Sequence, residues 1–261
     1  MSRSHGKSTV SRRSEILEEL NSKGQVSVVK LSKAFHVSEV TIRNDLAQLE
    51  KQNVLIRARG GAFKIILHHI GIDSPLSKKG KEHFQEKQRI GQAAIKFIED
   101  GDTIIIDSGT TTMEMSQNLN QFKDLTIITN ALNIASILSE NNNFNIFMPG
   151  GFLRTKSLSL VGSLAEESFH DFYCDTLFLG ADGFDTKYGL STPNVEEAHM
   201  NMIMIEIAKK VIVVADSSKF ARRRFAFIAP ISKIDVVITD SGIPEEDKQR
   251  LERAGVEVII A

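Results

Sequence analysis

Continuous apolar runs alternate with amphipathic segments over the last two thirds of the chain. Runs such as Ile104–Ile106 and Val211–Val214 are apolar at every position, which is typical of strands buried on both faces of a sheet. Between these runs, apolar residues recur at helical spacing. Strands that alternate with helices in this way predict an α/β domain with a mostly parallel sheet and helices on both of its faces.

The expected elements of this domain follow one another closely from residue 84 to residue 261. Helices are expected over 84–98, 113–119, 131–138, 164–172, 195–210 and 245–254, and strands over 103–107, 125–130, 144–151, 175–183, 211–216, 236–240 and 256–261. Residues 65–83 lack a steady period and contain Gly71, Pro75 and Gly80, so we expect a linker there.

The first 64 residues follow a different pattern, with three short amphipathic segments and then a hairpin. Helices are expected over 11–23, 27–35 and 39–52, and Ser38 is expected to cap the third. Two short strands around Gly60-Gly61 complete the segment. A helix, a short turn and a second helix form the helix-turn-helix layout, to which the hairpin adds a wing.

The third helix of this segment has a polar outer face. At about 100° per residue, Ile42, Leu46 and Leu49 point together toward the core, so the opposite side faces outward. In a recognition helix, arginine bonds guanine and asparagine bonds adenine through base edges in the major groove. The candidate DNA-binding residues are Ser38, Val40, Thr41, Arg43 and Asn44 and, on one face of the wing, Arg57 and Arg59. A solvated helix surface is the alternative interpretation.

The charge is distributed unevenly along the chain, although the formal net charge is only −1. Residues 1–64 carry 12 basic and 6 acidic side chains, whereas residues 65–261 carry 20 basic and 27 acidic ones. A basic segment joined to an acidic domain is typical of a nucleic-acid-binding protein that has a separate second domain.

Polar side chains follow the expected strands at their carboxyl ends, where open parallel sheets bind ligands. The first such stretch, "DSGTTT" over 107–112, stands between a buried strand and a helix. Hydroxyl side chains, a glycine and a helix N-terminus are typical of an anion cradle that binds phosphate. The candidate effector-binding residues are Asp107, Ser108, Gly109, Thr110, Thr111, Thr112, Asn130, Gly150, Gly151, Arg154, Asp182, Gly183, Glu196 and Lys219.

The chemistry of these residues favours a small phosphorylated metabolite over a nucleotide. The chain has neither the P-loop pattern G-x-x-x-x-G-K-[ST] nor G-x-G-x-x-G after a first strand. Arg154 and Lys219 would add positive charge near a phosphoryl group, while Asp107, Asn130 and Asp182 would bond hydroxyls. Each stretch taken singly also matches ordinary turn chemistry. We expect no cofactor and no metal, because His68-His69 lacks further ligands at suitable spacing.

The motifs in both parts of the chain resemble the DeoR family of bacterial transcription regulators. In the first part they are Arg13, Ile16, the run Ser38-x-x-Thr41-Ile42-Arg43-Asn44-Asp45-Leu46 and "RARGGA". In the second they are "DSGTTT", "TN", "GG-x-x-R", "FLGADG", Glu196-Glu197-Ala198 and "DSSKF". Many family members carry a second basic residue where this chain has Asn44, a difference that bears on the operator sequence. Asp45 is expected to bond a nearby arginine or a backbone N–H.

The resemblance implies a winged helix-turn-helix domain over residues 1–64, a linker over 65–83, and an effector domain over 84–261. It also implies that the effector domain is similar in fold to ribose-5-phosphate isomerase and the coenzyme A transferases. We expect a repressor of a carbohydrate catabolic operon, of the amino-sugar or sugar-alcohol type. A phosphorylated sugar would release it from operator double-stranded DNA. Because one recognition helix contacts a short site, a homo-oligomer, either a dimer or a tetramer, is expected.

The alternative function is a sugar-phosphate isomerase with a DNA-binding appendage. Asp107, Asp182, Glu196 and Glu197 are carboxylates of the kind that shuttle protons beside a carbonyl. The helix-turn-helix segment favours the regulator over the enzyme. A cytoplasmic protein is expected, because Cys174 is the single cysteine and no apolar run approaches the roughly 20 residues of a membrane span. The first residues also lack the apolar stretch of a secretory signal.

Overall fold

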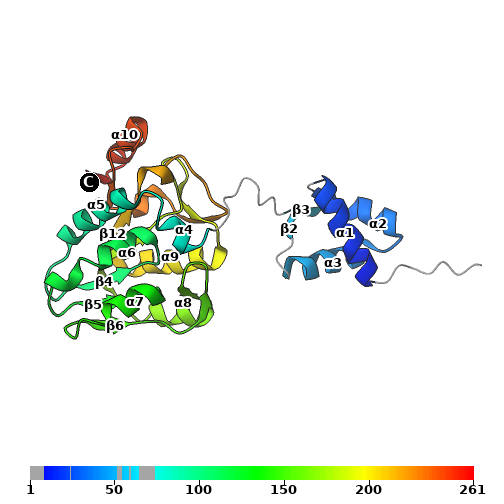
Figure 1. Cartoon of the computed structure of the whole chain (residues 1–261). Helices are drawn as coiled ribbons and strands as arrows, with labels where there is room; N and C mark the ends of the chain where they lie inside the picture. Colours follow the sequence, from blue (N-terminus) through cyan, green and yellow to red (C-terminus); the bar gives the residue numbers. More distant parts are fainter. Residues whose placement is uncertain (1–8, 24, 52–54, 59, 65–73) are drawn as a thin grey trace, which may run out of the picture. The chain divides into compact units, whose positions relative to one another are not determined.

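The computed structural model describes residues 9–23, 25–51, 55–58, 60–64 and 74–261, and the chain divides into two compact units, Met1–His69 and Ile70–Ala261 (Figure 1). In the first unit the elements are α1 (Thr9–Lys23), β1 (Gln25–Ser27), α2 (Val28–Phe35), α3 (Glu39–Lys51), β2 (Leu55–Ala58) and β3 (Gly61–Lys64). The three strands form an antiparallel sheet in the order β1-β3-β2. The expected winged helix-turn-helix is confirmed, and β1 is an additional strand that the sequence pattern did not predict.

The core of the first unit lies where the amphipathic pattern places it. Ile42, Leu46 and Leu49 of α3 are buried, and they pack with Ile16 of α1 and Leu31 of α2. Because these apolar side chains all leave α3 on one side, the opposite side of this helix stays exposed.

A buried ion pair joins α1 to α3. Asp45 of α3 accepts hydrogen bonds from Arg12 Nε at 2.6 Å and from Arg13 Nε at 2.8 Å, and its side chain is only 3% exposed. This confirms the expectation that Asp45 bonds a nearby arginine. Since Asn44 and Asp45 are adjacent, the pair also fixes the rotation of α3 about its own axis.

The second unit contains a fully parallel sheet of seven strands in the order β15-β14-β12-β9-β4-β5-β6. The strands are β4 (Thr103–Ile106), β5 (Thr126–Ile128), β6 (Asn145–Phe147), β9 (Cys174–Gly180), β12 (Ala208–Val214), β14 (Val236–Thr239) and β15 (Glu257–Ile260). All of them lie within or next to the apolar runs, so the expected mostly parallel sheet is confirmed.

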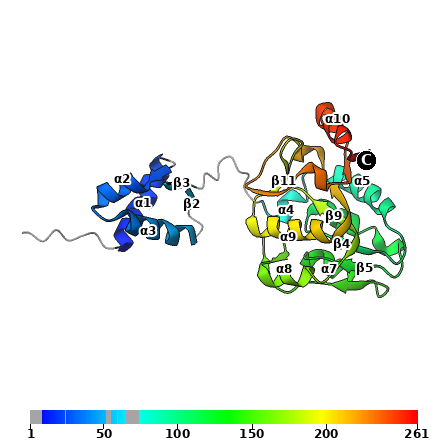
Figure 2. The ribbon, with the colours of Figure 1, turned by 180° about the vertical axis from the view of Figure 1, so that it is seen from behind.

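Helices cover both faces of this sheet. The helices are α4 (Leu76–Lys79), α5 (Phe84–Ala94), α6 (Thr110–Ser116), α7 (Leu132–Leu138), α8 (Ser163–Phe169), α9 (Val195–Ile207) and α10 (Glu245–Arg253), with short 3₁₀ helices η1 (Ile95–Phe97), η2 (Leu119–Gln121), η3 (Ser217–Lys219) and η4 (Ile231–Lys233). Helices α5, α6, α7, α8 and α9 can be followed around the sheet in Figures 1 and 2. Ile104 and Ile106 pack in one core with residues of α5, α6 and α7, whereas Ile105 packs in the other core with residues of α8 and α9. Successive side chains of β4 thus pack into opposite cores, which explains why the run is apolar at every position.

Two small antiparallel sheets were not predicted. One pairs β7 (Phe152–Arg154) with β8 (Ser159–Val161), and the other has the order β10-β11-β13, formed by Gly183–Asp185, Gly189–Thr192 and Ala226–Ala229. Their strands have three or four residues each, and all of them except the apolar β13 mix apolar with polar or glycine positions. Such short segments carry too little periodicity to be recognised.

Several boundaries differ from the expected ones, and three of them bear on the site. Helix α6 begins at Thr110 rather than Met113, so the threonines form its first turn. Helix α9 ends at Ile207, because β12 begins at the next residue. The second unit begins at Ile70, and α4 lies in the segment expected as a linker. Across the residues that the structure describes, no helix combines the length and apolarity that a membrane crossing requires.

Replacing Asp45 with asparagine is expected to destabilise the first unit by about 3 kcal/mol, because it leaves two partly buried guanidinium groups without their counter-charge. Hydrogen exchange of the α1 and α3 amides in the full-length protein measures this local stability. The control is Glu39→Gln, which breaks the exposed pair with Arg43 and is expected to cost less than about 1 kcal/mol. Exchange in Asp45→Asn equal to that of the wild type would contradict the prediction.

Candidate functional sites

The outer surface of α3 carries the candidate DNA-binding residues at its N-terminal end. Ser38 caps the helix, since its Oγ accepts a hydrogen bond from the Thr41 N–H at 3.1 Å. Val40 is 62% exposed, and Arg43 and Asn44 are also exposed. Four of the five helix candidates thus lie together around the first turn and a half of α3, with Ser38 directly before it.

The Arg43 side chain is held against α3 by Glu39, which lies one helical turn earlier. Its Nη2 donates to Glu39 Oε2 at 2.6 Å, and the Arg43 side chain remains 53% exposed. An exposed pair four residues apart contributes only about 0.3–0.5 kcal/mol, so the guanidinium can leave this partner at little energetic cost.

The other two DNA-binding candidates, Arg57 and Arg59, belong to the wing. Arg57 lies in β2, where its Cα pairs with that of Ala62 in β3, and Arg59 lies outside the described residues. The hairpin that carries Arg57 is formed as expected.

A cavity lies at the carboxyl ends of three neighbouring strands of the large sheet, β12, β9 and β4. Seven of the candidate effector-binding residues line it: Asp107, Ser108, Gly109, Thr110, Thr111, Asp182 and Lys219. They follow β4, β9 and β12, which are adjacent in the sheet. Parallel pairing therefore brings together side chains that are more than 100 residues apart in the sequence.

The other seven candidates do not line the cavity. Thr112 is fully buried and its Oγ1 donates to the Gly109 carbonyl at 3.1 Å. Asn130 is buried, and its Nδ2 donates to the Leu160 carbonyl at 3.4 Å. Glu196 is exposed to solvent. These three side chains are directed to the protein interior or to the surface, away from the cavity.

The three remaining glycines have structural reasons for being glycine. Gly151 has a φ of +127°, and a Cβ there would lie 2.7 Å from the Val161 carbonyl oxygen. A Cβ on Gly183 would lie 2.8 Å from the Arg222 carbonyl oxygen. Gly150 packs against Leu164. Gly109, by contrast, has an extended φ of 174°, which any residue adopts.

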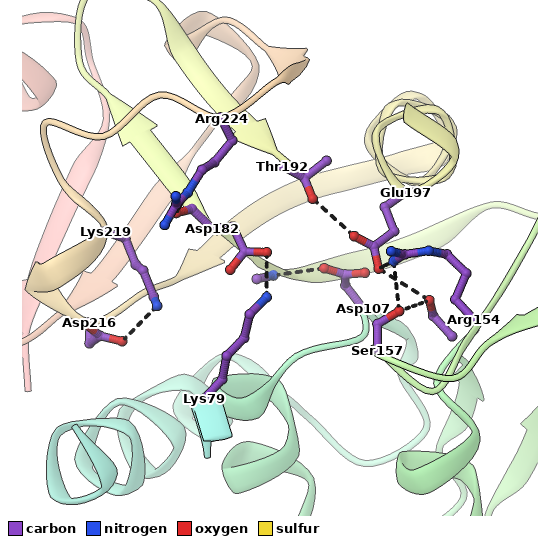
Figure 3. A network of polar contacts seen from close by, with 12 residues as sticks. Lys79, Asp107, Arg154, Ser157, Asp182, Thr192, Glu197, Asp216, Lys219 and Arg224 are labelled. Atoms are coloured by element: carbon purple, nitrogen blue, oxygen red, sulfur yellow. Dashed lines mark hydrogen bonds and ion pairs between the residues drawn. The ribbon is translucent and has the colours of Figure 1, made fainter. Parts of the chain in front are cut away.

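Arg154 reaches the cavity through Glu197. Its Nη1 donates to Glu197 Oε1, and Thr192 Oγ1 donates to the second carboxylate oxygen at 3.1 Å (Figure 3). Asn194 caps α9 by accepting from the Glu197 N–H at 2.9 Å. Glu197 lines the cavity although its neighbour Glu196 does not, because adjacent residues on a helix point about 100° apart.

Asp107 is a buried carboxyl group at the centre of the cavity wall, with only 3% of its surface exposed. Gly180 N–H donates to its Oδ2 at 3.2 Å, and the Asn201 amide nitrogen, oriented toward it, lies 3.2 Å from Oδ1. Burial, followed by the negative charges of Glu197 and Asp182, raises the pKa of Asp107 to about 8. The group therefore donates as well as accepts hydrogen bonds at neutral pH.

Positive charge gathers on the opposite wall. Lys79 Nζ lies 2.8 Å from Asp182 Oδ2, and Lys219 Nζ lies 3.9 Å from Asp216 Oδ2. Both lysines line the cavity, and Figure 3 shows that their side chains extend toward the same region of it as Asp182. Arg224 Nε donates to the Asp182 carbonyl at 3.0 Å.

A third lysine is buried behind this wall. Lys87 of α5 is 1% exposed, and its Nζ donates to the carbonyls of Lys79 at 2.6 Å and Glu82 at 2.5 Å. Burial lowers the pKa of Lys87, and the positive charge of Lys219 lowers it further, while Asp216 raises it. Lys87 thus ties the end of α4 and the following turn to α5.

The lining of the cavity offers two chemically distinct sets of groups. The ammonium groups of Lys79 and Lys219 and the Ser108–Thr111 stretch suit an anion. The carboxyl and amide groups of Asp107, Glu197 and Asn201 suit the hydroxyls of a polyol. Within the described residues, no group of three or more His, Cys, Asp or Glu side chains is arranged to hold a metal ion.

Several lining residues were not among the effector-binding candidates. They are Leu76 and Lys79 of α4, Ser157, Gly180, Ala181, Thr192, Ile228, and Glu197 and Asn201 of α9. Of these, Glu197 was named as a carboxylate of the isomerase alternative. The four-residue spacing of Glu197 and Asn201 behind the cap Asn194 is a signal that they share one helix face. Lys79 could not be predicted as a lining residue, because the sequence around it has no steady apolar period.

Comparison with known proteins matches both units of the chain. The family described as a DeoR-like helix-turn-helix domain matches residues 12–65, and the family described as the DeoR C terminal sensor domain matches residues 82–241.

Curated relatives align with nearly the whole chain. A protein of Escherichia coli O157:H7, named provisionally as an aga operon transcriptional repressor, is 40% identical over 97% of this chain and 94% of its own length. The HTH-type transcriptional repressor GlcR of Bacillus subtilis is 34% identical over 94% of this chain and 93% of its length. The HTH-type transcriptional regulator GlpR of Haloferax volcanii is 34% identical over 95% of this chain and 96% of its own length.

Among solved structures, a ribose-5-phosphate isomerase with phospho-erythronic acid is similar, with a TM-score of 0.40 and 20% identity. The similarity covers 53% of this chain and 54% of the isomerase.

The raised pKa of Asp107 makes the stability of the second unit depend on pH. The folded carboxyl group holds its proton more tightly than the unfolded one, whose pKa is 3.8. The stabilising contribution is therefore present below about pH 4 and is lost as the pH rises toward about 8. Asp107→Asn removes this titration. As the pH rises from about 4 to about 8, the free energy of unfolding of the variant is therefore expected to increase by a few kcal/mol relative to that of the wild type.

Urea unfolding of the wild type and Asp107→Asn over this pH range measures the effect. Asp171→Asn, which changes an exposed carboxylate, is the control and is expected to show no such pH-dependent gain. A constant difference between Asp107→Asn and the wild type at all pH values would contradict the assignment.

Proposed function

The chain belongs to the DeoR family of transcription regulators, as its motifs led us to expect, and we propose that it represses a carbohydrate catabolic operon until a phosphorylated sugar releases it from the operator. It is a DNA-binding regulator rather than an enzyme, because relatives that match nearly its whole length are named as regulators or repressors.

The observation that supports sensing of a sugar phosphate is the two-sided chemistry of the cavity. A phosphoryl group would lie against the Ser108–Thr111 stretch, with Lys219 supplying a charge-assisted hydrogen bond. Sugar hydroxyls would then face Glu197 and Asn201. Glu197 is already oriented by Arg154 and Thr192, so hydrogen bonds to a ligand cost little further ordering.

For DNA recognition, we assign the N-terminal unit to the operator and the exposed end of α3 to base edges. Arg43 and Asn44 would read bases, Thr41 and Val40 would contact the groove wall, and Ser38 would fix the start of the helix. The wing arginines Arg57 and Arg59 would contact phosphates. Phosphate contacts set affinity and register, and base contacts set specificity.

We further propose a homo-oligomer, a dimer or a tetramer, that acts in the cytoplasm. A single recognition helix reads only a few base pairs, so two or more copies on repeated half-sites are needed for a unique operator. Release by a ligand requires that the ligand bind the DNA-free arrangement more tightly than the DNA-bound one.

Arg43→Ala tests the recognition helix. A bidentate contact between arginine and guanine contributes about 1–3 kcal/mol of discrimination, so preference for the operator over a shuffled duplex is expected to fall by about tenfold or more. The operator is first selected from a random duplex library with the full-length protein, and affinities are measured at one salt concentration. Gln48→Ala, which changes an exposed residue further along α3, is the control. An unchanged preference in Arg43→Ala would refute the assignment.

Lys219→Ala tests the effector site. Loss of a charge-assisted hydrogen bond to the phosphoryl group is expected to weaken sugar-phosphate binding by about 10–100-fold. Calorimetric titration with ribose 5-phosphate, fructose 6-phosphate and glucosamine 6-phosphate, followed by operator release, measures binding and response. Lys233→Ala removes an exposed lysine outside the cavity and is expected to behave as wild type. Equal binding by Lys219→Ala and Lys233→Ala would show that the phosphoryl group lies elsewhere.

A further inference from the structure

Helix α4 is the first described element that follows the segment joining the two units in the sequence. It spans only Leu76–Lys79, yet both of its end residues line the effector cavity. The chain that leaves the DNA-binding unit therefore reaches the cavity before it enters any strand of the large sheet.

Polar contacts hold α4 on the sensor unit. Lys79 Nζ pairs with Asp182 Oδ2 at 2.8 Å, and the Lys79 carbonyl accepts from the buried Lys87 Nζ at 2.6 Å. At its other end, the Leu76 N–H donates to the Lys156 carbonyl at 3.1 Å. No α4 side chain is buried, so little apolar packing adds to these polar contacts. The position of α4 thus depends strongly on polar groups at the cavity wall (Figure 3).

We propose that Lys79 is a binding residue for the effector and that, through it, the ligand controls the segment leading to the DNA-binding unit. This inference rests on the proposed function, because it requires an anionic ligand in the cavity. A phosphoryl group carries a charge of about −1.5 to −2, whereas Asp182 carries at most −1. An anion seated between Lys79 and Lys219 therefore competes with Asp182 for the Lys79 ammonium group.

The environment makes this competition effective. The side chains of Lys79 and Asp182 are only 19% and 20% exposed, so solvent screens their interaction less than it screens a surface pair. The Lys79 carbonyl also accepts a hydrogen bond from the buried Lys87 Nζ, so a change of partner at the Lys79 side chain would be felt at the hydrogen bond that ties α4 to α5. Residues 76–79 then have two arrangements, one with Lys79 on Asp182 and one with Lys79 on the ligand, and the ligand favours the second.

The coupling between ligand and DNA is the quantity that tests this role. It is the ratio of the operator Kd with a saturating sugar phosphate to the Kd without it, measured on the full-length protein with the most effective of the three sugar phosphates above. The wild type is expected to show a ratio of about 5 or more. In Lys79→Ala the ratio is expected to fall to within twofold of 1 at ligand concentrations that saturate the variant by calorimetry. Lys79→Arg, which keeps the charge, is expected to retain most of the coupling.

Lys78→Ala is the matched control, since Lys78 is its neighbour in α4 but is exposed and does not line the cavity. It is expected to keep the wild-type ratio. Asp182→Asn is the complementary variant, and without ligand its operator affinity is expected to shift toward the ligand-bound value of the wild type. Hydrogen exchange of the 76–83 amides is expected to change on adding ligand to the wild type.

The outcomes separate the two proposals. Wild-type coupling in Lys79→Ala, or unchanged exchange over 76–83 with ligand bound, would overturn the role of Lys79 and leave the proposed function intact. An unaltered operator affinity in ligand-free Asp182→Asn would also overturn it. Failure of every sugar phosphate to bind the wild type or release it would overturn the proposed function and this inference together.

Discussion

Parallel pairing of the seven strands is the constraint on which the sensor unit depends. It sets the carboxyl ends of β4, β9 and β12 side by side, so Asp107, Asp182 and Lys219 meet at one edge although they are far apart in the sequence. The same arrangement buries Asp107 away from solvent and places other carboxylates near it, and both effects raise the pKa of Asp107. Lysines on the opposite wall offset this negative charge and leave the cavity suited to a ligand with an anionic end and a polar end.

The sequence predicted most of the fold because the strongest signals are periodic. Unbroken apolar runs such as Ile104–Ile106 identified the parallel strands, and the 3.6-residue pattern of α3 identified its buried side. The three-residue strands β7 and β8 were missed, because they have too few positions to show a period. Helix α4 was missed for a related reason, since its four residues contain one apolar side chain.

Cavity-lining residues that directly follow a strand could be predicted from the sequence. Residues whose position depends on the face of a helix, or on a contact with a distant side chain, could not. Ser108 and Thr111 line the cavity, as their place after β4 required. Glu196 was chosen but Glu197 lines the cavity, because the choice depends on the phase of α9, which begins at Val195. Arg154 contacts the Glu197 carboxylate, a contact that no local pattern specifies.

A crystal structure of the full-length chain with an operator-releasing sugar phosphate would locate the effector. We expect the phosphoryl oxygens within hydrogen-bonding reach of the Ser108–Thr111 stretch and of Lys219, with the sugar hydroxyls toward Glu197 and Asn201. A phosphoryl group bound away from this edge of the sheet, with Lys219 uninvolved, would contradict this expectation.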